Sequence, residues 1–454
     1  MSNNRKRVVV VGLGRQGWAV IRQLLKLWQR GNGYEIYVYD VNEAHEETVL
    51  SNYSRISRSI KRLHEEAYPI VKKLRDENAD LRLALKQIEP HLLINASVFT
   101  GNEFYTTAAF EIGCDYIDLG QNTWLAIKQR ALNQRIREAQ KRVRIIPECG
   151  LAPGLVNILG AWLLQSGGDS LQMRVGGLPI DTHKGGDLHY GLSWSPQGLI
   201  QEYTDAAIAR KDGRITSIIG LYSNADRESP LRSTFGVAPF AVNNSDLCKR
   251  LIQHMEPTFF GQTPGGGWAI QNLEARPTSD GSSLMPFDPA FAGISDLEYK
   301  TLRFYPHFDQ IESMVQANSI ELLGSLPPAS PDMVLLRVWV EQDGTILRNI
   351  EAIILGDANY QDGPSNDVFA FTAMQHLTGW PVALVADALL NYDVAGAGHQ
   401  LYRADEMLWS GQSLHSALRN GGVIMPYELV SGSRILDLLN SDFFIPEREF
   451  RVSL

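Results

Sequence analysis

A glycine-rich turn directly after a short apolar run is the feature that most constrains the fold of this chain. The sequence GLGRQG occupies residues 12–17 and follows Arg7–Val11, a β-branched run typical of a buried parallel strand. An amphipathic helical pattern then covers 16–29, and a second strand is predicted over 36–39, ending at Asp40. Strand, turn, helix and strand in this order predict a right-handed βαβ unit.

In this context each glycine has a physical role in binding a dinucleotide. Gly12 permits the tight turn, Gly14 lets the backbone approach a pyrophosphate, and Gly17 allows close packing of helix against strand. The helix begins near Arg15 and Gln16, where unsatisfied N–H groups and the helix dipole favour a phosphate. The alternative interpretation is a structural glycine turn in another kind of α/β sheet.

Asp40 lies about where a carboxylate would bind the adenosine ribose hydroxyls of such a cofactor. A carboxylate repels a 2′-phosphate, and neither Lys nor Arg occurs at 41–43. We therefore predict NAD as the cofactor in preference to NADP. Arg55 and Arg58 lie further along the chain and keep NADP as the less favoured alternative.

Predicted strands and helices resume their alternation only from residue 91 onward. Strands are predicted at 91–96, 116–119 and 143–147, and helices at 104–112 and 124–140. Residues 41–87 are mostly helical in pattern and show no clear third strand. The alternation predicts an α/β fold whose N-terminal domain, 1–150, is a doubly wound Rossmann sheet. Helices within 365–400 are candidates to complete that domain.

The carboxyl ends of the parallel strands are expected to meet at one edge of this sheet. Asn95, Ala96 and Ser97 follow one strand and are predicted to line the nicotinamide side. Asp118 ends the next strand and is a candidate for cofactor binding or catalysis. A buried carboxylate that caps a turn is the alternative for Asp118.

After residue 147 the sequence becomes richer in glycine, proline and aromatic residues. Strand-like runs occur at 172–176, 215–221 and 333–341, irregular loops are expected at 261–290 and 324–332, and a long helix interrupted by Pro381 is expected at 369–390. We predict a second, α+β domain over 151–364, built on an antiparallel or mixed sheet. Residues 401–454 are predicted to be a C-terminal extension.

Composition excludes several classes of protein. The 454 residues carry a formal net charge of −9, without the clustered basic face that nucleic-acid binding requires. The three cysteines have neither metal-type spacing nor a disulfide framework, so we predict no metal site and a cytoplasmic location. No apolar stretch approaches the ~20 residues that span a bilayer. A small molecule is the expected partner.

Segments spread over most of the chain carry a more specific pattern. They are DLGQNT (118–123), IPECGLAPGLVNILG (146–160), GGLP (176–179), GLSWSPQGLIQEY (191–203), YKTLRFYPH (299–307) and TAMQHLTGWPVAL (372–384). In this order they resemble the saccharopine dehydrogenase family, and within it the lysine 6-dehydrogenase branch. The resemblance implies a Rossmann domain, a second domain for substrate and dimer contacts, and hydride transfer at a carbon that bears nitrogen.

Several positions depart from the family pattern. The family usually has Gly at Gln121, an acidic residue at Trp124, Glu at Gln197, and a small residue where Phe304 and Tyr305 stand. An ammonium substrate requires carboxylate partners. The loss of acidic groups therefore argues against lysine itself as the substrate.

The resemblance also suggests substrate-binding residues. Arg303 falls where a substrate carboxylate would be held, a task that suits its planar fork, and a structural Arg is the alternative. Glu202 is a candidate to neutralise a substrate amine, or else a helix-surface residue. Tyr190 and Ser193 flank a predicted loop of the same pocket, or else pack in the core.

Two histidines, His189 and His307, are candidates for the general base, because imidazole titrates near neutrality. A structural role is the alternative for each. Cys149 is expected near the cofactor as a small packing residue, since hydride transfer requires no thiol nucleophile.

The glycine motif and Asp40 predict an NAD-dependent oxidoreductase, and the resemblance implies that it acts on a C–N bond of an amino acid. The nearest alternative is a saccharopine- or carboxynorspermidine-type reductase, which condenses an amine with a carbonyl compound. The alternative from another class is an NAD-binding module without turnover.

Overall fold

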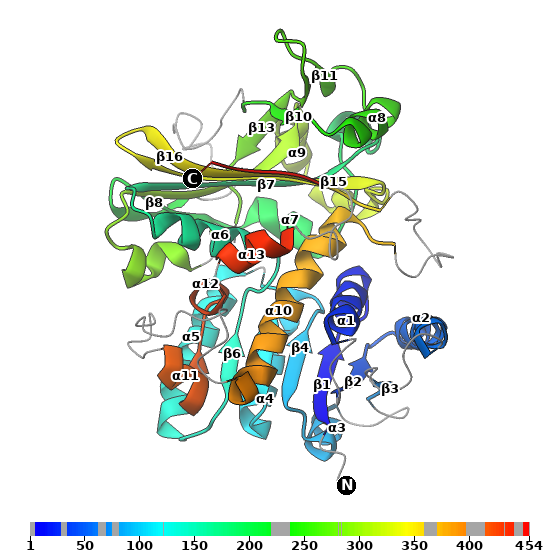
Figure 1. The fold of residues 1–454 in the computed structure, drawn as a ribbon, viewed down its shortest axis with the longest axis vertical. Coiled ribbons are helices and arrows are strands. Elements are labelled where there is room, and N and C mark those ends of the chain that lie inside the picture. The colour runs from blue at the N-terminus through cyan, green and yellow to red at the C-terminus, as the bar shows by residue number, and fades with distance from the viewer. Residues whose placement is uncertain are drawn as a thin grey trace. The chain divides into compact units, whose positions relative to one another are not determined.

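The computed structural model describes most of the chain. It covers residues 5–28, 34–61, 70–74, 81–120, 122–218, 237–279, 281–282, 284–357, 370–395, 414–430, 432–439 and 448–453. The chain divides into two compact units, each built from two separate segments (Figure 1). Unit 1 comprises Met1–Leu155 and Leu377–Ser431, and unit 2 comprises Val156–His376 and Gly432–Leu454. Within the predicted extension, residues 401–413, 431, 440–447 and 454 lie outside the described part.

A parallel sheet forms the centre of unit 1, with the strand order β17-β6-β5-β4-β1-β2-β3 among the described residues. Its strands are β1 (Lys6–Val11), β2 (Tyr34–Tyr39), β3 (Ile70–Lys73), β4 (Leu92–Asn95), β5 (Asp115–Asp118), β6 (Arg144–Ile146) and β17 (Gly422–Val423). Val11 pairs with both Tyr39 and Asn95, and Asn95 pairs with Asp118. The carboxyl ends of β2, β1, β4 and β5 therefore line up along one edge. This sheet confirms the predicted α/β class.

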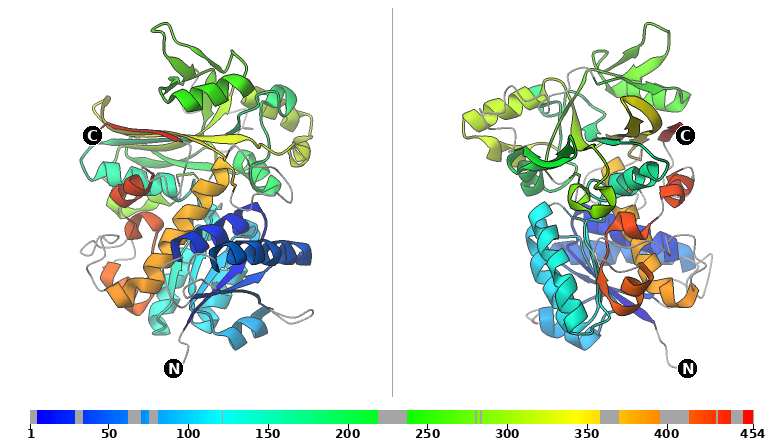
Figure 2. Two further views of the ribbon diagram at one scale, coloured as in Figure 1. Left: turned by 45° about the vertical axis from the view of Figure 1, so that its right-hand side comes forward. Right: turned by 90° about the vertical axis from the view of Figure 1, so that its left-hand side faces the viewer.

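Helices follow the strands of unit 1. They are α1 (Arg15–Leu27), α2 (Glu43–Lys61), α3 (Leu81–Ile88), α4 (Asn102–Ile112), α5 (Thr123–Glu138), α10 (Ala373–Ala395), α11 (Leu414–Asn420) and α12 (Pro426–Leu429), with a 3₁₀ turn η2 (Phe99–Gly101). Pro381 lies inside α10, as the sequence suggests. Helix α10 runs beside α1 (Figure 2), and a Cβ on its Gly379 would lie only 2.9 Å from the backbone of Ala19. A glycine is therefore required where these two helices approach most closely.

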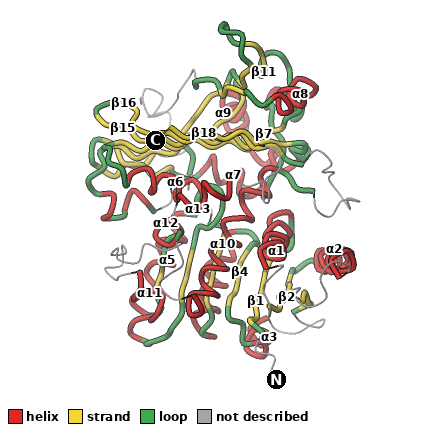
Figure 3. Tube along the Cα trace, in the orientation of Figure 1, coloured by secondary structure: helices red, strands yellow, loops and turns green. Residues whose placement is uncertain are grey.

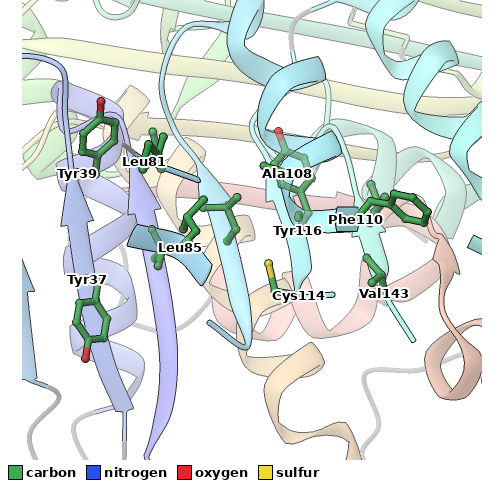
Figure 4. Close-up of a cluster of buried hydrophobic side chains, with 14 of the residues drawn as sticks. Tyr37, Tyr39, Leu81, Leu85, Ala108, Phe110, Cys114, Tyr116 and Val143 are labelled. Carbon is green, nitrogen blue, oxygen red and sulfur yellow. The ribbon is translucent and has the colours of Figure 1, made fainter. Parts of the chain in front are cut away.

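The hydrophobic core of unit 1 follows from the alternation of side chains along the strands. Val9 and Val11 of β1 point into one buried cluster with Tyr116 and Val143, and Tyr39 of β2 joins it. Figure 4 shows this cluster, in which residues of α3 and α4 cover the strands. Packing of these helices holds the strand ends in fixed positions.

The prediction of no strand within residues 41–87 is wrong. β3 covers Ile70–Lys73 and pairs in parallel with β2. The strand is only four residues long, stands at the sheet edge and ends in two lysines, so it lacks the apolar run of a buried strand. The expected irregular loop at 261–290 likewise contains the short strands β12 (Trp268–Ile270) and β13 (Leu273–Arg276).

Unit 2 is built on a mixed sheet with the order β18-β16-β15-β7-β14-β8-β9, and β13 also pairs with β14. Figure 3 shows the strands of this sheet in yellow, with β7, β15, β16 and β18 labelled. Its strands are β7 (Ser170–Pro179), β8 (Ala207–Lys211), β9 (Arg214–Ile218), β13, β14 (Asp296–Phe304), β15 (Asp332–Gln342), β16 (Thr345–Leu355) and β18 (Arg448–Ser453). β7 and β14 are parallel, and the other described pairs are antiparallel. The predicted mixed sheet is therefore present.

A small sheet and several helices complete unit 2. The small sheet has the order β10-β12-β11, with β10 at Phe240–Val242 and β11 at Phe260–Gln262. The helices are α6 (Leu155–Leu164), α7 (Pro196–Thr204), α8 (Ser245–His254), α9 (His307–Gln316) and α13 (Gly432–Leu439), with 3₁₀ turns η3 (Gly186–Leu188), η5 (Met285–Phe287), η6 (Pro289–Phe291) and η7 (Ile320–Ser325). α7 and α9 hold the polar cluster described below.

Candidate functional site

The glycine-rich turn between β1 and α1 is shaped by two glycines that the protein itself requires. Gly12 has a φ of +83°, and a Cβ there would overlap the backbone of Ser97. A Cβ on Gly17 would overlap the carbonyl oxygen of Gly12. These two glycines let α1 begin directly against the sheet edge.

Gly14 differs from both, because nothing within the protein requires a glycine there. Its φ of −64° and ψ of −165° are open to any residue, and among the described residues no atom outside the adjoining backbone lies within 4 Å of the position of a Cβ. Gly14 is also the N-cap of α1, and no side chain caps this helix end in the described structure. The open space and the uncapped helix end fit a diphosphate that approaches the backbone closely.

Asp40 stands at the carboxyl end of β2, next to this turn. Its Oδ2 accepts the Leu13 N–H at 2.5 Å, and its Oδ1 accepts the Asn42 N–H at 2.8 Å. The side chain of Asp40 is 9% exposed, and His45 Nδ1 lies 3.3 Å from Oδ2. Backbone donors thus fix the carboxylate beside the glycine turn, where it would meet a ribose.

The end of β4 lies at the same edge and is organised by side-chain hydrogen bonds. Asn95 Oδ1 accepts from Ser97 N at 3.1 Å and Ser97 Oγ at 2.6 Å. Asn95 Nδ2 donates to Asn102 Oδ1 at 2.7 Å, and Ala96 N–H donates to Val11 O at 2.8 Å. Asn95 is buried and shapes the turn, whereas Ala96 and Ser97 are partly exposed at this edge.

Asp118 is fully buried and stabilises the turn that follows β5. Its carboxylate accepts from Gly120 N at 2.8 Å, Glu148 N at 2.9 Å and Gln129 Nε2 at 2.6 Å. Burial raises the pKa of Asp118, and these hydrogen bonds oppose the rise. Burial also raises the pKa of Cys149 well above its ordinary value, so this thiol is not a nucleophile.

In unit 2, Arg303 of β14 is the centre of a buried polar cluster. Its Nη2 lies 3.1 Å from Glu202 Oε2, and its Nε donates to Tyr203 OH at 2.9 Å. The guanidinium also lies over the Tyr190 ring, 4.7 Å from the centroid. Thr301 Oγ1 donates to Glu202 Oε1 at 2.6 Å. Because α7 carries both Glu202 and Tyr203, this helix sets the geometry of the cluster.

The hydrogen bonds of this cluster have a defined direction. Leu188 O can only accept, so His307 Nδ1 donates to it at 2.8 Å, and Nε2 accepts from Tyr203 OH at 2.8 Å. Tyr203 OH in turn accepts from Arg303 Nε. Burial and the charge of Arg303 hold the pKa of His307 well below its usual range, so its ring is neutral.

The two candidate bases differ in burial and in the hydrogen bonds of their ring nitrogens. His307 is fully buried, and both of its ring nitrogens are occupied. His189 is half-buried, has a φ of +46° and uses one nitrogen, Nδ1, on Thr182 O at 2.7 Å. Because Thr182 O only accepts, Nε2 of His189 carries the lone pair of its neutral ring.

Sequence reasoning missed Tyr203, the residue that joins Arg303 to His307. The one sequence signal for Tyr203 was its position directly after Glu202, because an aromatic residue is otherwise ordinary in an amphipathic helix. Tyr190 and Ser193 are both buried on the segment before α7, and the Ser193 hydroxyl lies 3.6 Å from the position of a Cβ on Gly177.

The glycine turn, the acidic residue after β2 and the parallel sheet define a Rossmann-type dinucleotide-binding fold joined to an α+β unit. A family model described as the saccharopine dehydrogenase C-terminal domain matches residues 150–423. This is more than half of the chain, so the chain belongs to the saccharopine dehydrogenase family, as the resemblance predicts.

Curated relatives are consistent with this assignment. Mitochondrial alpha-aminoadipic semialdehyde synthase of Mus musculus is 21% identical over 452 residues, covering 87% of this chain and 45% of that protein. The enzyme of the same name from Bos taurus is 23% identical over 322 residues, covering 58% of this chain and 34% of that protein. The chain therefore spans less than half the length of these relatives.

Solved structures show the same fold. Saccharopine dehydrogenase (L-Glu forming) of Saccharomyces cerevisiae is 15% identical, covers 99% of this chain and 100% of its own, and gives a TM-score of 0.58. Homospermidine synthase of Legionella pneumophila, solved with NAD, is 12% identical, covers 99% and 91%, and gives 0.52. Among the described residues, no helix is long and apolar enough to cross a membrane.

Proposed function

We propose that the chain is a nicotinamide-dinucleotide-dependent oxidoreductase that acts on a C–N bond of an amino acid or amine, with NAD as its cofactor. The observation that carries this proposal is Gly14, a glycine that faces open space in an unstrained conformation. The carboxylate of Asp40, fixed beside the same turn, favours a ribose with both hydroxyls. Membership of a dehydrogenase family supports the reaction class.

In unit 2 we propose that Glu202, and not Arg303, meets the substrate directly. Arg303 is 3% exposed, and its charge is already neutralised by Glu202. A substrate carboxylate would have to displace that ion pair. Glu202 is partly exposed and held by Arg303 and Thr301, so its carboxylate has a fixed position from which it can orient a substrate ammonium.

The proposed reaction removes a proton and a hydride from the substrate amine. His189, with its lone pair on Nε2, is the proposed acceptor of the ammonium proton. The bound nicotinamide supplies the hydride acceptor. The C–H electron pair leaves as hydride, the C–N bond becomes an imine, and the imine then hydrolyses or cyclises. We assign His307 a positioning role: its neutral, fully buried ring accepts the hydrogen bond of Tyr203, which in turn holds Arg303.

The test of the cofactor site is Gly14→Ala, with Gly293→Ala as the matched control. Both positions have open space for a Cβ and an unstrained φ, and Gly293 is an exposed residue of unit 2. We expect Gly14→Ala to raise the NAD dissociation constant at least about tenfold, because the methyl group occupies the space of the diphosphate. Thermal stability should change little in either variant. Equal NAD affinity in both variants would contradict the proposal.

Turnover is tested with NAD and a panel of amino acids and amines, by the absorbance of reduced nicotinamide. Reduction of NAD with a single amine, lysine included, supports the dehydrogenase. Oxidation of NADH only when an amine and a carbonyl compound are both present would assign the saccharopine- or carboxynorspermidine-type reductase instead. Binding of NAD without either reaction would leave a binding module.

A further inference from the structure

A histidine that the proposed reaction does not use lies against the carboxylate of Asp40. His45 is in the first turn of α2, and its Nδ1 is 3.3 Å from Asp40 Oδ2. Its Nε2 is 3.4 Å from Asn42 Nδ2. The ring therefore contacts two residues of the segment that follows β2, on the proposed ribose side of the glycine turn.

The partners of the ring define its proton. The amide nitrogen of Asn42 can only donate, so His45 Nε2 accepts and the ring proton sits on Nδ1, facing Asp40. In this form the ring is neutral. Its side chain is 46% exposed, so a proton from water can reach Nε2 when the contact with Asn42 opens.

The charge of His45 changes the net charge of a small group of acidic and basic side chains around Asp40. Glu46 Oε1 accepts the Asp40 N–H at 3.0 Å, so this second carboxylate lies directly behind Asp40. Lys73 of β3 is 3.0 Å from Glu46 Oε2 and 3.5 Å from Glu43 Oε1. Among the described residues, three carboxylates and one ammonium thus leave two negative charges when His45 is neutral and one when it is protonated.

We infer that the protonation of His45 controls how strongly this edge prefers NAD over NADP. With His45 neutral, two net negative charges repel a 2′-phosphate, and the edge selects an unphosphorylated ribose. With His45 protonated, the imidazolium offsets Asp40 and donates a charge-assisted hydrogen bond to the phosphate. The inference rests on the proposed dinucleotide site and adds a pH-dependent cofactor preference to it.

The test measures dissociation constants of NAD and NADP for the full chain by calorimetry at pH 8 and pH 6. For the wild type, we expect the ratio of the NADP dissociation constant to the NAD dissociation constant to fall at least about tenfold from pH 8 to pH 6. A tenfold change corresponds to the strength of one charge-assisted hydrogen bond. In His45→Gln this ratio should change with pH only by the part that comes from titration of the 2′-phosphate itself. That part is the same in every variant.

Two further variants keep the test decisive. His183→Gln is the matched control, because His183 Nδ1 also lies 3.3 Å from a carboxylate, that of Glu256, but in unit 2. It should keep the full pH response. His45→Lys supplies a permanent cation, so at pH 8 it should show the narrow preference that the wild type has at pH 6.

The outcomes separate this inference from the proposed function. If His45→Gln and the wild type show the same pH response, or if His45→Lys keeps the wide preference at pH 8, the inference is overturned while the dinucleotide site stands. If the folded wild type binds neither NAD nor NADP at either pH, the proposed function itself fails.

Discussion

At the scale of single residues, the sequence identifies positions whose chemistry depends on the backbone. The glycine turn and Asp40 could be predicted because their spacing is set by local geometry, and the structure places Gly12, Gly14 and Asp40 together. Tyr203 could not be predicted, because its partner Arg303 is 100 residues away in sequence. A long-range hydrogen bond leaves no local periodicity to detect.

Tyr203→Phe should destabilise the protein by about 1–3 kcal/mol, the cost of leaving a buried donor or acceptor without its partner. The substitution removes the hydroxyl that joins Arg303 Nε to His307 Nε2, and all three residues are buried. Urea unfolding measures the change. Tyr190→Phe is the control, because its hydroxyl takes part in a longer hydrogen bond, from Trp194 at 3.3 Å. An equal cost for both variants would contradict the central role of Tyr203.

His307 should make stability depend on pH. Burial and Arg303 lower its pKa in the folded state, so protonation favours the unfolded chain. Its stabilising contribution is therefore complete above the ordinary histidine pKa of ~6.5 and falls below it, by at most about 1.4 kcal/mol per pH unit. The measurement compares urea unfolding of wild type and His307→Gln between pH 7.5 and 5. A difference between them that does not change with pH would show that His307 does not titrate on unfolding.

At the scale of secondary-structure elements, sequence patterns predicted the central strands of unit 1 and also β15, but they missed the long strand β16 and the short strands β3 and β12. β1 contains four consecutive valines, and β15 contains an apolar run interrupted by Arg337, so both strands are visible in the sequence pattern. β3 has four residues and two lysines, and β12 has three residues, so tertiary pairing and not propensity creates them. Edge strands of this kind give too little local signal.

The junction of β13 and α9 depends on one buried carboxyl group. Glu274 Oε1 accepts the N–H of Phe308 in the first turn of α9 at 2.9 Å, and burial raises the Glu274 pKa to about 7. A carboxyl group with a raised pKa stabilises the fold fully below its ordinary pKa of 4.5, and the penalty grows as pH rises toward 7. Above pH 7 the folded state therefore holds a carboxylate that costs free energy.

Glu274→Gln should remove that cost and keep an oxygen for the Phe308 N–H. We expect a gain of roughly 3 kcal/mol in unfolding free energy at pH 8, because ionisation costs about 1.4 kcal/mol for each pH unit between 4.5 and about 7, and almost no gain at pH 4.5. Urea unfolding at both values tests this. Glu321→Gln, at an exposed position of η7, should show neither effect. A loss of stability at pH 8 would show that the ionised carboxylate is needed at the junction.

At the scale of the whole molecule, the chain leaves unit 1 after residue 155 and returns to it at residue 377. The returning segment supplies polar and backbone contacts to the first segment. Asp387 of α10 accepts from Trp28 Nε1 at 3.0 Å, and Asn391 accepts from Tyr34 OH at 2.8 Å. β17 also extends the parallel sheet beyond β6. The first 155 residues are therefore an incomplete folding unit.

A fragment of residues 1–155 should consequently fail to unfold cooperatively and should bind a hydrophobic dye, because α10 no longer covers α1. Joining residues 377–431 to it through a flexible linker should restore a sigmoidal urea transition, since both segments of unit 1 are then present. In the joined protein, Gly379→Leu should lower the urea concentration at the midpoint of unfolding, because a side chain there would overlap the backbone of Ala19 and Val20. Cooperative unfolding of the short fragment alone would show that the glycine turn and its sheet fold without the returning segment.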